Sequence, residues 1–286
     1  MEPPRQKDAG GPLPPHPTLA DYYGSAADRP QFVRELFDAT ARGYDRIERG
    51  MALGWGRWYR REALRRAGLC EGLTVLDVAV GTGLVAREAA RLAGDPRLVT
   101  GLDPSAGMLR EARRQLLLPG VLGVAERLPF PDGSFDMVSL GYGLRHMSDL
   151  AVVFGEFARV LAPGGTLCVL ELTRPASRAG RAILRVYLRG VVPVLARLRT
   201  RNREAAVLMR YFWDTVDACV PPQRILAALD GAGFEGVGWT LAIGIFSEYT
   251  ARKPGPDRAP RRPPRKPERS NFFVRRMERQ PPASRS

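Results

Sequence analysis

VLDVAVGTG, from Val75 to Gly83, places a carboxylate inside an apolar run and then two glycines one residue apart. The apolar run has the length of a strand, and a helical pattern follows it from Leu84. A parallel strand that enters a helix through a glycine turn is a nucleotide-binding device, because glycine lets the backbone turn tightly and approach a ligand closely. We therefore expect Gly81 and Gly83 to face a bound nucleotide, with Asp77 on the strand just before them.

A second acid supports this interpretation. Asp103 ends the next apolar run, in VTGLDPS, and stands 22 residues after Gly81. At that spacing an acid is expected to bind ribose hydroxyls. Ala86 stands where the dinucleotide fingerprint has its third glycine, which alanine can replace, and no Lys-Ser/Thr pair follows as in a phosphate-binding loop. The residues alone leave a dinucleotide and S-adenosylmethionine as alternatives.

Strand and helix patterns alternate along most of the chain. Strands are expected at 73–79, 98–102, 121–124, 135–140 and 166–172, followed by an antiparallel pair within 239–250. Helices are expected at 31–69, 84–92, 106–117, 150–161 and 225–230. This alternation predicts an α/β domain with a mostly parallel sheet covered by helices on both faces. The long basic helical segment 174–220 interrupts the rhythm, and we expect it to be an insertion that forms a substrate lid.

The two ends of the chain differ in composition from the centre. Residues 1–30 are rich in proline, and residues 254–286 are rich in proline and arginine, so both are expected to be disordered arms around a domain of residues 31–253. The segment 271–279 of the tail is the exception, with a short docking helix as the alternative. The net charge is +14, but residues 252–286 carry +9 of it, so we expect no nucleic-acid partner for the domain.

The sequence also limits the location of the protein. The most apolar stretch, 183–198, is broken by arginines, and the N-terminus has no apolar signal region. The cysteines are three, widely spaced and odd in number, so neither a disulfide framework nor a metal site is expected. These features predict a cytoplasmic protein.

Further motifs resemble one known family. ERLPFPDGSFDMVSLGYGLRHMSD at 126–149 and FARVLAPGGTLCVLEL at 157–172 are similar to the ubiquinone/menaquinone biosynthesis C-methyltransferases, which belong to the class I S-adenosylmethionine-dependent methyltransferases. The resemblance covers about residues 32–253. It implies a Rossmann-like fold with a seven-stranded sheet, S-adenosylmethionine as cofactor, and C-methylation of a ring carbon of a prenylated quinol.

The resemblance also implies roles for single residues. Gly81 and Gly83 would bracket the methionine part of the cofactor, with Asp77 near its amino-acid end, and Asp103 would bind the ribose. The remaining cofactor contacts would come from Met108, from Ala125 and Glu126 below the adenine, and from Tyr44 on a helix that closes over the cofactor. Asp77 has a purely structural role as its alternative.

Two positions depart from the family pattern. Val124 replaces an Asp that accepts a hydrogen bond from the adenine amino group, a loss on the order of 1 kcal/mol, for which Glu126 is a candidate compensation. His146 replaces an Asn after Arg145. The second departure leaves a different aromatic acceptor open.

The expected chemistry gives these last two residues candidate catalytic roles. A ring carbon becomes nucleophilic when a neighbouring phenol, with a pKa of about 10, loses its proton. His146 follows the fourth strand and suits a general base, while Arg145 suits the stabilisation of a phenolate. A backbone-bonded imidazole and an exposed, salt-bridged arginine are the structural alternatives.

Two further questions stay open in the sequence. Arg178, Arg181, Arg185 and Arg189 fall at helical spacing among apolar residues, which fits either a core-facing helix or a helix on an anionic membrane surface. Besides quinol methylation, a methyltransferase of another aromatic metabolite and a non-catalytic scaffold are alternatives. The sequence does not predict an oligomeric state.

Overall fold

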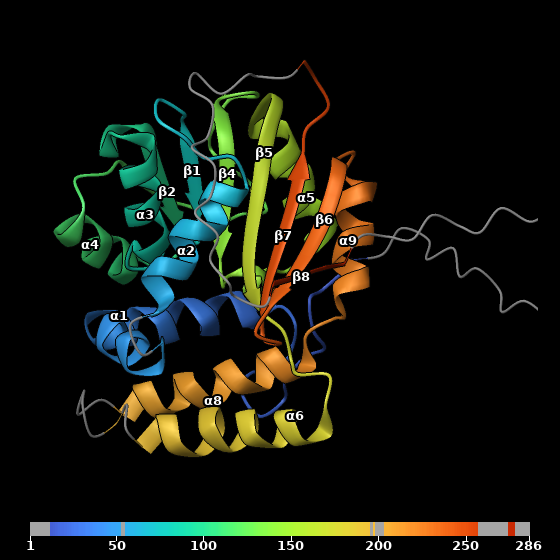
Figure 1. The fold of residues 1–286 in the computed structure, drawn as a ribbon. Coiled ribbons are helices and arrows are strands. Elements are labelled where there is room, and N and C mark those ends of the chain that lie inside the picture. The colour runs from blue at the N-terminus through green and yellow to red at the C-terminus, as the bar shows by residue number, and fades with distance from the viewer. Residues whose placement is uncertain (1–11, 53–54, 195–196, 198–202, 257–273, 278–286) are drawn as a thin grey trace, which may run out of the picture.

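The computed structural model describes residues 12–52, 55–194, 197, 203–256 and 274–277. Their strands form one sheet in the order β3-β2-β1-β4-β5-β7-β6-β8 (Figure 1). The first five strands are mutually parallel, and β7 runs antiparallel to β5 and β6. The strand bounds are β1 Val75–Val78, β2 Val99–Asp103, β3 Gly120–Leu122, β4 Phe135–Gly141, β5 Leu161–Leu172, β6 Glu235–Ala242, β7 Phe246–Arg252 and β8 Val274–Met277.

Helices cover both faces of this sheet, as the alternating pattern predicts. Helices α2 (Trp55–Arg66), α3 (Leu84–Ala93) and α4 (Ala106–Gln115) pack with one face of the strands. Helices α5 (Leu150–Val160) and α9 (Pro222–Gly231) pack with the other. Neighbouring residues of β1 point to opposite faces: Val75 packs in the core under α2, α3 and α4, and Leu76 packs in the core under α5 and α9. The predicted α/β class is confirmed.

The order of strands reverses at β1. The chain runs outward from β1 to β2 and β3, then crosses back to β4 on the other side of β1. In open α/β sheets, ligands bind beyond the carboxyl ends of the strands at such a reversal. The register places Asp77 of β1 beside Ser139 of β4 and Gly101 of β2. The predicted cofactor residues therefore lie at the edge where this fold binds its ligands.

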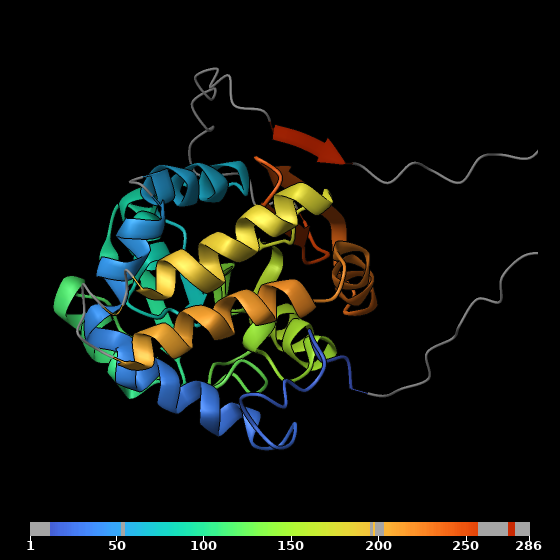
Figure 2. The same cartoon turned by 90° about the horizontal axis from the view of Figure 1, so that it is seen from below.

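A layer of helices lies across that edge (Figures 1 and 2). It contains α1 (Arg29–Ala52), α6 (Arg178–Arg185), the π-helical turn η3 (Val186–Val191) and α8 (Arg203–Ala218). Their apolar side chains, including Val33, Leu188 and Trp213, form a third core. Within segment 174–220, residues 178–194 and 203–218 are helical, and its role as a substrate lid stays a prediction.

The N-terminal arm differs from the prediction. Residues 12–28 were expected to be disordered, but they pack on the domain: Leu150 N donates to Leu13 O at 2.9 Å, and Val220 N donates to Pro15 O at 2.7 Å. His16 and Tyr23 are buried. The apolar and aromatic residues inside this proline-rich segment supply enough buried surface to order it. Residues 1–11 lie outside the described residues.

The C-terminal tail contributes one strand to the sheet. Strand β8 pairs antiparallel with β6, with Trp239 opposite Met277, so the sheet has the seven expected strands and an eighth. The alternative of a docking helix at 271–279 is wrong for these four residues. The outer edge of β6 presents backbone groups that a strand can pair, which explains the preference for a strand. Residues 257–273 and 278–286 lie outside the described residues.

Candidate active site

A cavity of about 820 Å³ lies between the sheet edge and the helical layer. We call its two parts the sheet end and the helix end. The sheet end is formed by Met108 and by the carboxyl ends of β1, β2, β3 and β4 with the loops that follow them, at residues 77–82, 102–104, 124–126 and 141–143. The helix end is lined by Val33, Phe37, Trp55, Trp58, Tyr59, Leu184, Tyr187, Leu188, Phe212, Ile243 and Phe246. Nearly all predicted cofactor residues lie at the sheet end, and Tyr44 of α1 lines the cavity with them.

The glycine turn has the conformation that glycine alone adopts readily. Gly81 has a φ of 56° and Gly83 a φ of 86°. A Cβ at Gly83 would lie 2.9 Å from Leu116 Cδ1, so this position is also too close to α4 for a side chain. A Cβ at Gly81 would meet nothing nearer than 3.9 Å. Gly81 therefore leaves space for a ligand, while Gly83 packs the turn.

Asp103 is held by the two loops it joins. Its Oδ2 accepts from Gly81 N and its Oδ1 from Ser105 N, both at 2.8 Å. Burial raises the pKa of this carboxyl to about 6. A carboxylate has about four acceptor positions, and two backbone donors leave the others for ribose hydroxyls. The geometry fits the predicted role.

Asp77 combines the two roles considered for it. Its Oδ1 accepts from Ser139 Oγ at 2.6 Å, which fixes the carboxylate to β4. Its Oδ2 is buried and has no hydrogen-bond partner within the described chain. Burial raises the pKa of Asp77 to about 7. A cationic group, such as the ammonium of an amino acid, would supply the missing partner.

Helix α1 is pinned to both cofactor loops by carboxylates. Asp45 accepts from Thr82 Oγ1 at 2.5 Å, and Asp38 accepts from Ser105 Oγ and Gly107 N at 2.6 Å each. Tyr44 lies between them in the sequence and lines the cavity. Our sequence prediction missed Asp38, although its spacing of seven residues from Asp45 places both on one face of a helix.

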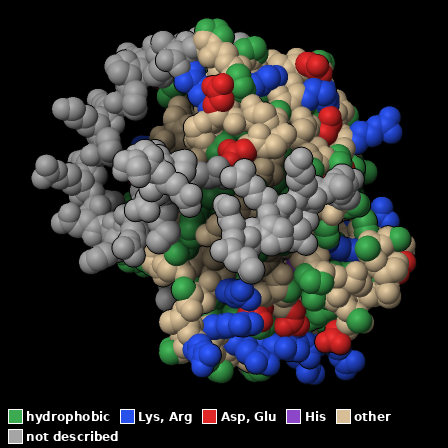
Figure 3. Space-filling model, turned by 90° about the vertical axis from the view of Figure 1, so that its right-hand side faces the viewer, with side chains coloured by type: hydrophobic (Ala, Val, Ile, Leu, Met, Phe, Trp, Pro, Cys, Tyr) green, Lys and Arg blue, Asp and Glu red, His purple; other side chains and the backbone are tan. Residues whose placement is uncertain are grey.

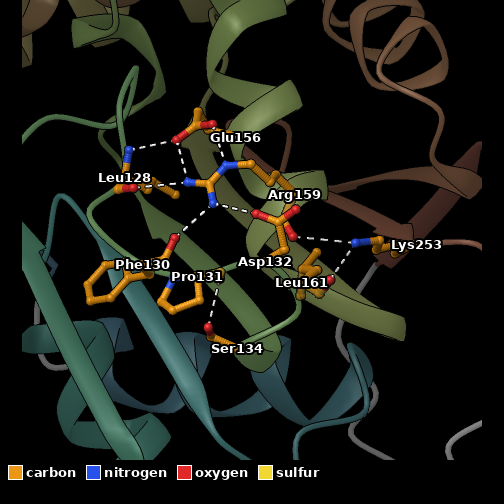
Figure 4. Close-up of polar contacts among 9 residues, drawn as sticks. All are labelled: Leu128, Phe130, Pro131, Asp132, Ser134, Glu156, Arg159, Leu161 and Lys253. Carbon is orange, nitrogen blue, oxygen red and sulfur yellow. Dashed lines mark hydrogen bonds and ion pairs between the residues drawn. The ribbon is translucent and has the colours of Figure 1, made fainter.

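The loop expected below the adenine is fixed from the opposite face of the sheet. Ala125 is buried, and Glu126 Oε1 accepts from Ser148 N at 2.6 Å, so this carboxylate already has a partner. Just downstream, Glu156 and Arg159 of α5 bind the backbone of Leu128 (Figure 4). Asp132 of the PDGS segment, residues 131–134, pairs with the same Arg159 at 2.8 Å, so this segment is held by α5 together with the loop. Val124 lines the cavity and is 45% exposed.

Arg145 does not have the position predicted for it. The side chain is 1% exposed, pairs with the buried Glu171, and donates from Nε to Thr215 Oγ1 at 3.2 Å. Its guanidinium carbon lies 4.2 Å from the centroid of the Phe212 ring. Arg145 is not among the described residues that line the cavity. A buried ion pair therefore takes the place both of the predicted contact with an acceptor and of its alternative, an exposed salt bridge.

His146 lines the cavity, as predicted. Its ring stacks on Tyr211 at 5.5 Å and meets Phe37 edge-on at 5.2 Å between centroids. Neither ring nitrogen has a hydrogen-bond partner within the described chain, so the backbone-bonded alternative does not hold. Burial and the nearby arginines hold the pKa of His146 well below its usual range. The imidazole is therefore neutral at pH 7, with a pKa below the ordinary histidine value of about 6.5 that suits a general base.

Together, a glycine turn after β1, free acceptor positions on Asp103 and a cavity at the strand reversal define a nucleotide-binding α/β domain. A SAM-dependent methyltransferase from Aquifex aeolicus has the same fold, with a TM-score of 0.51, 17% identity, and coverage of 68% of this chain and 89% of that one. The chain belongs to the ubiE/COQ5 methyltransferase family, whose sequence pattern matches residues 25–253.

Two relatives show how similar the chain is to other proteins of this kind. A demethylmenaquinone methyltransferase from Mycobacterium sp. (strain KMS) is 37% identical over 226 residues, which cover 79% of this chain and 95% of the relative. The ubiquinone/menaquinone biosynthesis C-methyltransferase UbiE from Coxiella burnetii (strain Dugway 5J108-111) is 31% identical over 229 residues, covering 77% and 90%. S-adenosylmethionine is the cofactor of the enzyme, and the sheet end fits it.

Proposed function

We propose that this enzyme methylates a ring carbon of a prenylated quinol. The observation that carries the proposal is the continuity of the cavity, which joins the cofactor residues of the sheet end to an apolar helix end. Aromatic and aliphatic walls of this kind bury a flat ring and the start of a polyprenyl tail. The printed names of the relatives, which refer to demethylmenaquinone and to ubiquinone/menaquinone biosynthesis, support the same class of acceptor.

The chain contributes positioning, exclusion of water and a proton acceptor. Bound at the sheet end, S-adenosylmethionine supplies an electrophilic methyl group, and transfer leaves S-adenosylhomocysteine. The acceptor hydroxyl gives its proton to a base as the ring carbon attacks the methyl group. The C–H proton of that carbon then leaves and the oxygen takes a proton back, so that one proton is released overall. His146 is neutral and lines the cavity, so we assign it the proton of the hydroxyl.

The experiment is transfer of a ¹³C-methyl group from labelled cofactor to a panel of acceptors. The proposal predicts label on a ring carbon of demethylmenaquinol and a faster reaction with longer tails. Label on an oxygen, or transfer only to phenols without a tail, would favour another aromatic metabolite as the acceptor. Binding of the cofactor without transfer to any acceptor would favour the non-catalytic alternative.

The role of His146 has its own test. His146→Asn removes the base but keeps the size and polarity usual in the family, and turnover should fall on the order of 100-fold between pH 6.5 and 8. The wild type should show no limb with a pKa of 6 to 7 in this range, because the imidazole is already neutral. A His146→Asn enzyme with unchanged turnover would assign the proton to another group.

We also infer that the enzyme works in the cytoplasm on the inner surface of a membrane. Among the described residues, no helix is both long and apolar enough to cross a bilayer. The cysteines are free thiols. Apolar side chains recur on the outside of α6, of η3 and of the helical residues 192–194 that follow, where Ile183, Val186 and Val194 are 71%, 65% and 59% exposed. Such a face, flanked by arginines, suits an anionic membrane surface.

Basic residues reinforce this face. Figure 3 shows Lys and Arg side chains gathered at the lower end of the molecule, where α6 and α8 lie in Figure 1. Sedimentation with vesicles tests the inference. Ile183→Ser/Val186→Ser should bind vesicles of phosphatidylglycerol more weakly than wild type, while Val152→Ser on the exposed side of α5 should not change binding. Equal sedimentation of all three proteins would contradict it.

A further inference from the structure

Arg60 of α2 is a buried cation that our sequence analysis assigned neither to cofactor binding nor to catalysis. It is 4% exposed and lines the cavity. Its NH2 group donates to Glu48 Oε1 of α1. Its Nε and NH1 are buried without a hydrogen-bond partner within the described chain. Arginine carries five N–H donors, so most of the donor capacity of this side chain is unused.

Two other arginines among the described residues are buried, Arg29 and Arg145, and both leave fewer nitrogens unpaired than Arg60 does. Arg29 donates from NH2 to Arg145 O at 2.7 Å, and only its Nε is buried without a partner. Arg145 pairs with Glu171 and Thr215 and packs on Phe212, and none of its nitrogens is left without a partner. A buried charged group with unused donors is costly, because the groups lose water and gain nothing in return. Arg145 therefore completes the scaffold, whereas Arg60 is paired with Glu48 through NH2 alone and leaves Nε and NH1 for a ligand.

The surroundings of Arg60 place it where the two ends of the cavity meet. Its guanidinium carbon lies 5.6 Å from the centroid of the Tyr142 ring, and Tyr142 holds a left-handed φ of 60° on the loop after β4. Non-glycine residues in that conformation are strained and concentrate at functional sites. The positive charge of Arg60 also acts on Asp77 to lower its pKa, against the larger effect of burial. Arg60 and Asp77, the carboxylate that suits the cofactor's ammonium, line the same cavity.

We propose that Arg60 is the anion receptor of this cavity and that its unused N–H groups bind an anionic oxygen of a reactant. Two sources carry that chemistry: the carboxylate of the cofactor's amino-acid end, beside Asp77, and the phenolate oxygen of the acceptor. Only the second source rests on the proposed function. Glu48 positions the guanidinium between them, because it holds NH2 and leaves the other nitrogens free.

Calorimetry tests the first source without any turnover. S-adenosylmethionine and its decarboxylated analogue are titrated into wild type, Arg60→Gln and Arg60→Lys. If Arg60 binds the carboxylate, Arg60→Gln should weaken binding of the cofactor at least tenfold and leave the analogue unaffected. Arg61→Gln, an exposed neighbour on α2, is the matched control and should bind both as wild type does.

A chromophoric phenol tests the second source, again without turnover. 4-Nitro-1-naphthol is titrated with base in the complex with S-adenosylhomocysteine, and its phenolate is followed by absorbance. If Arg60 binds the phenolate, the wild type should lower the pKa of the bound probe by at least one unit, and Arg60→Gln should abolish the shift. The activity of wild type on quinols tests the proposed function separately.

The inference is overturned by either of two results. One is that Arg60→Gln matches wild type in cofactor binding and in the ionisation of the probe. The other is that it binds cofactor and analogue more weakly by one common factor, which would show a structural role alone. Should Arg60→Gln fail to fold, Arg60→Lys takes its place in the same titrations. It keeps the charge but not the guanidinium N–H groups, so the proposal predicts weaker binding of the cofactor than of its analogue or a smaller pKa shift of the probe, and wild-type values in both would overturn it. Glu48→Gln should keep the preference for the carboxylate or the phenolate, since Arg60 remains.

Discussion

The two ends of one cavity are built in different ways. At the sheet end, short loops hold carboxylates and glycines in place through backbone hydrogen bonds, such as those from Gly81 and Ser105 to Asp103. At the helix end, side chains from α1, α2, η3 and the β6–β7 turn form an apolar wall, and Trp58 and Ile243 of that wall are 40% and 60% exposed. Directional bonds fix one ligand in one orientation, whereas apolar area tolerates ligands that differ in length. Substitutions at the sheet end should therefore change the affinity for the cofactor, and substitutions at the helix end should change the KM for the acceptor.

The largest effect is expected from Arg145, which belongs to neither end. Arg145→Met leaves Glu171 buried and unpaired, which typically costs about 3–5 kcal/mol of folding free energy. The midpoint temperature of thermal unfolding should then fall on the order of 10 °C, while the affinity of the folded protein for the cofactor stays nearly unchanged. Arg145→Met/Glu171→Met removes both charges and should recover most of the loss. Wild-type stability combined with lost turnover would return Arg145 to a catalytic role.

The contrast between Arg145 and Arg60 shows the limit of sequence reasoning. The sheet end could be predicted because its residues are close in the chain and their types and spacing are set by local geometry, as for Gly81, Gly83 and Asp103. The helix end unites residues from Val33 to Phe246, and no local spacing relates them. Arg60 stands among several arginines of α2, where the sequence pattern indicates a solvent-exposed face. Only the packing of α2 against α1 and β4 shows that this one is buried.

The sheet end is tested most strongly through Asp103. Asp103→Ala removes the acceptor for the ribose hydroxyls, and hydrogen bonds to charged groups are worth about 1.5–3 kcal/mol, so cofactor affinity should fall about 10- to 100-fold. The KM for the acceptor should change little. Calorimetry and steady-state kinetics measure the two quantities, with Asp21→Ala, exposed on the N-terminal segment, as the control. Unchanged cofactor affinity would remove Asp103 from the site.

The helix end should respond in the opposite way. Trp58→Ala removes apolar area at the mouth of the cavity, and the KM for a long-tailed quinol should rise about tenfold, in line with the burial of one large side chain. Cofactor affinity should stay within twofold. The effect should shrink as the tail is shortened. An equal effect on long and short tails would show that Trp58 contacts the ring rather than the tail.

The buried carboxylates predict a pH dependence of cofactor binding. In the free enzyme burial raises the pKa of Asp103 to about 6 and that of Asp77 to about 7. A cationic ligand binds the ionised forms better, so affinity should rise between pH 5 and 8 and then level off, about tenfold for each unit by which binding lowers a pKa. Asp77→Asn should remove the upper part of this rise. A flat profile in wild type would mean that neither carboxylate meets the ligand.

The same shifts predict an opposite trend in the stability of the free enzyme. A raised carboxyl pKa means that the folded state holds protons that the unfolded state releases, so the contribution of these two carboxyls to stability is greatest at low pH and falls as pH rises from about 4 to about 7. The lowered pKa values of His16 and His146 act in the opposite direction in both the free and the bound enzyme, so the comparison of the two isolates the carboxyls. Thermal scans of free and cofactor-bound enzyme across this range should therefore diverge as pH rises. Parallel curves would contradict the linkage.

The most direct test of the divided cavity is a crystal structure with S-adenosylhomocysteine and a short-chain demethylmenaquinone. The account predicts the ribose hydroxyls on Asp103, the amino-acid end beside Asp77, and the quinone ring at the helix end, with its unmethylated carbon facing the sulfur. A ring placed at Asp103, or bound outside the cavity, would contradict the account.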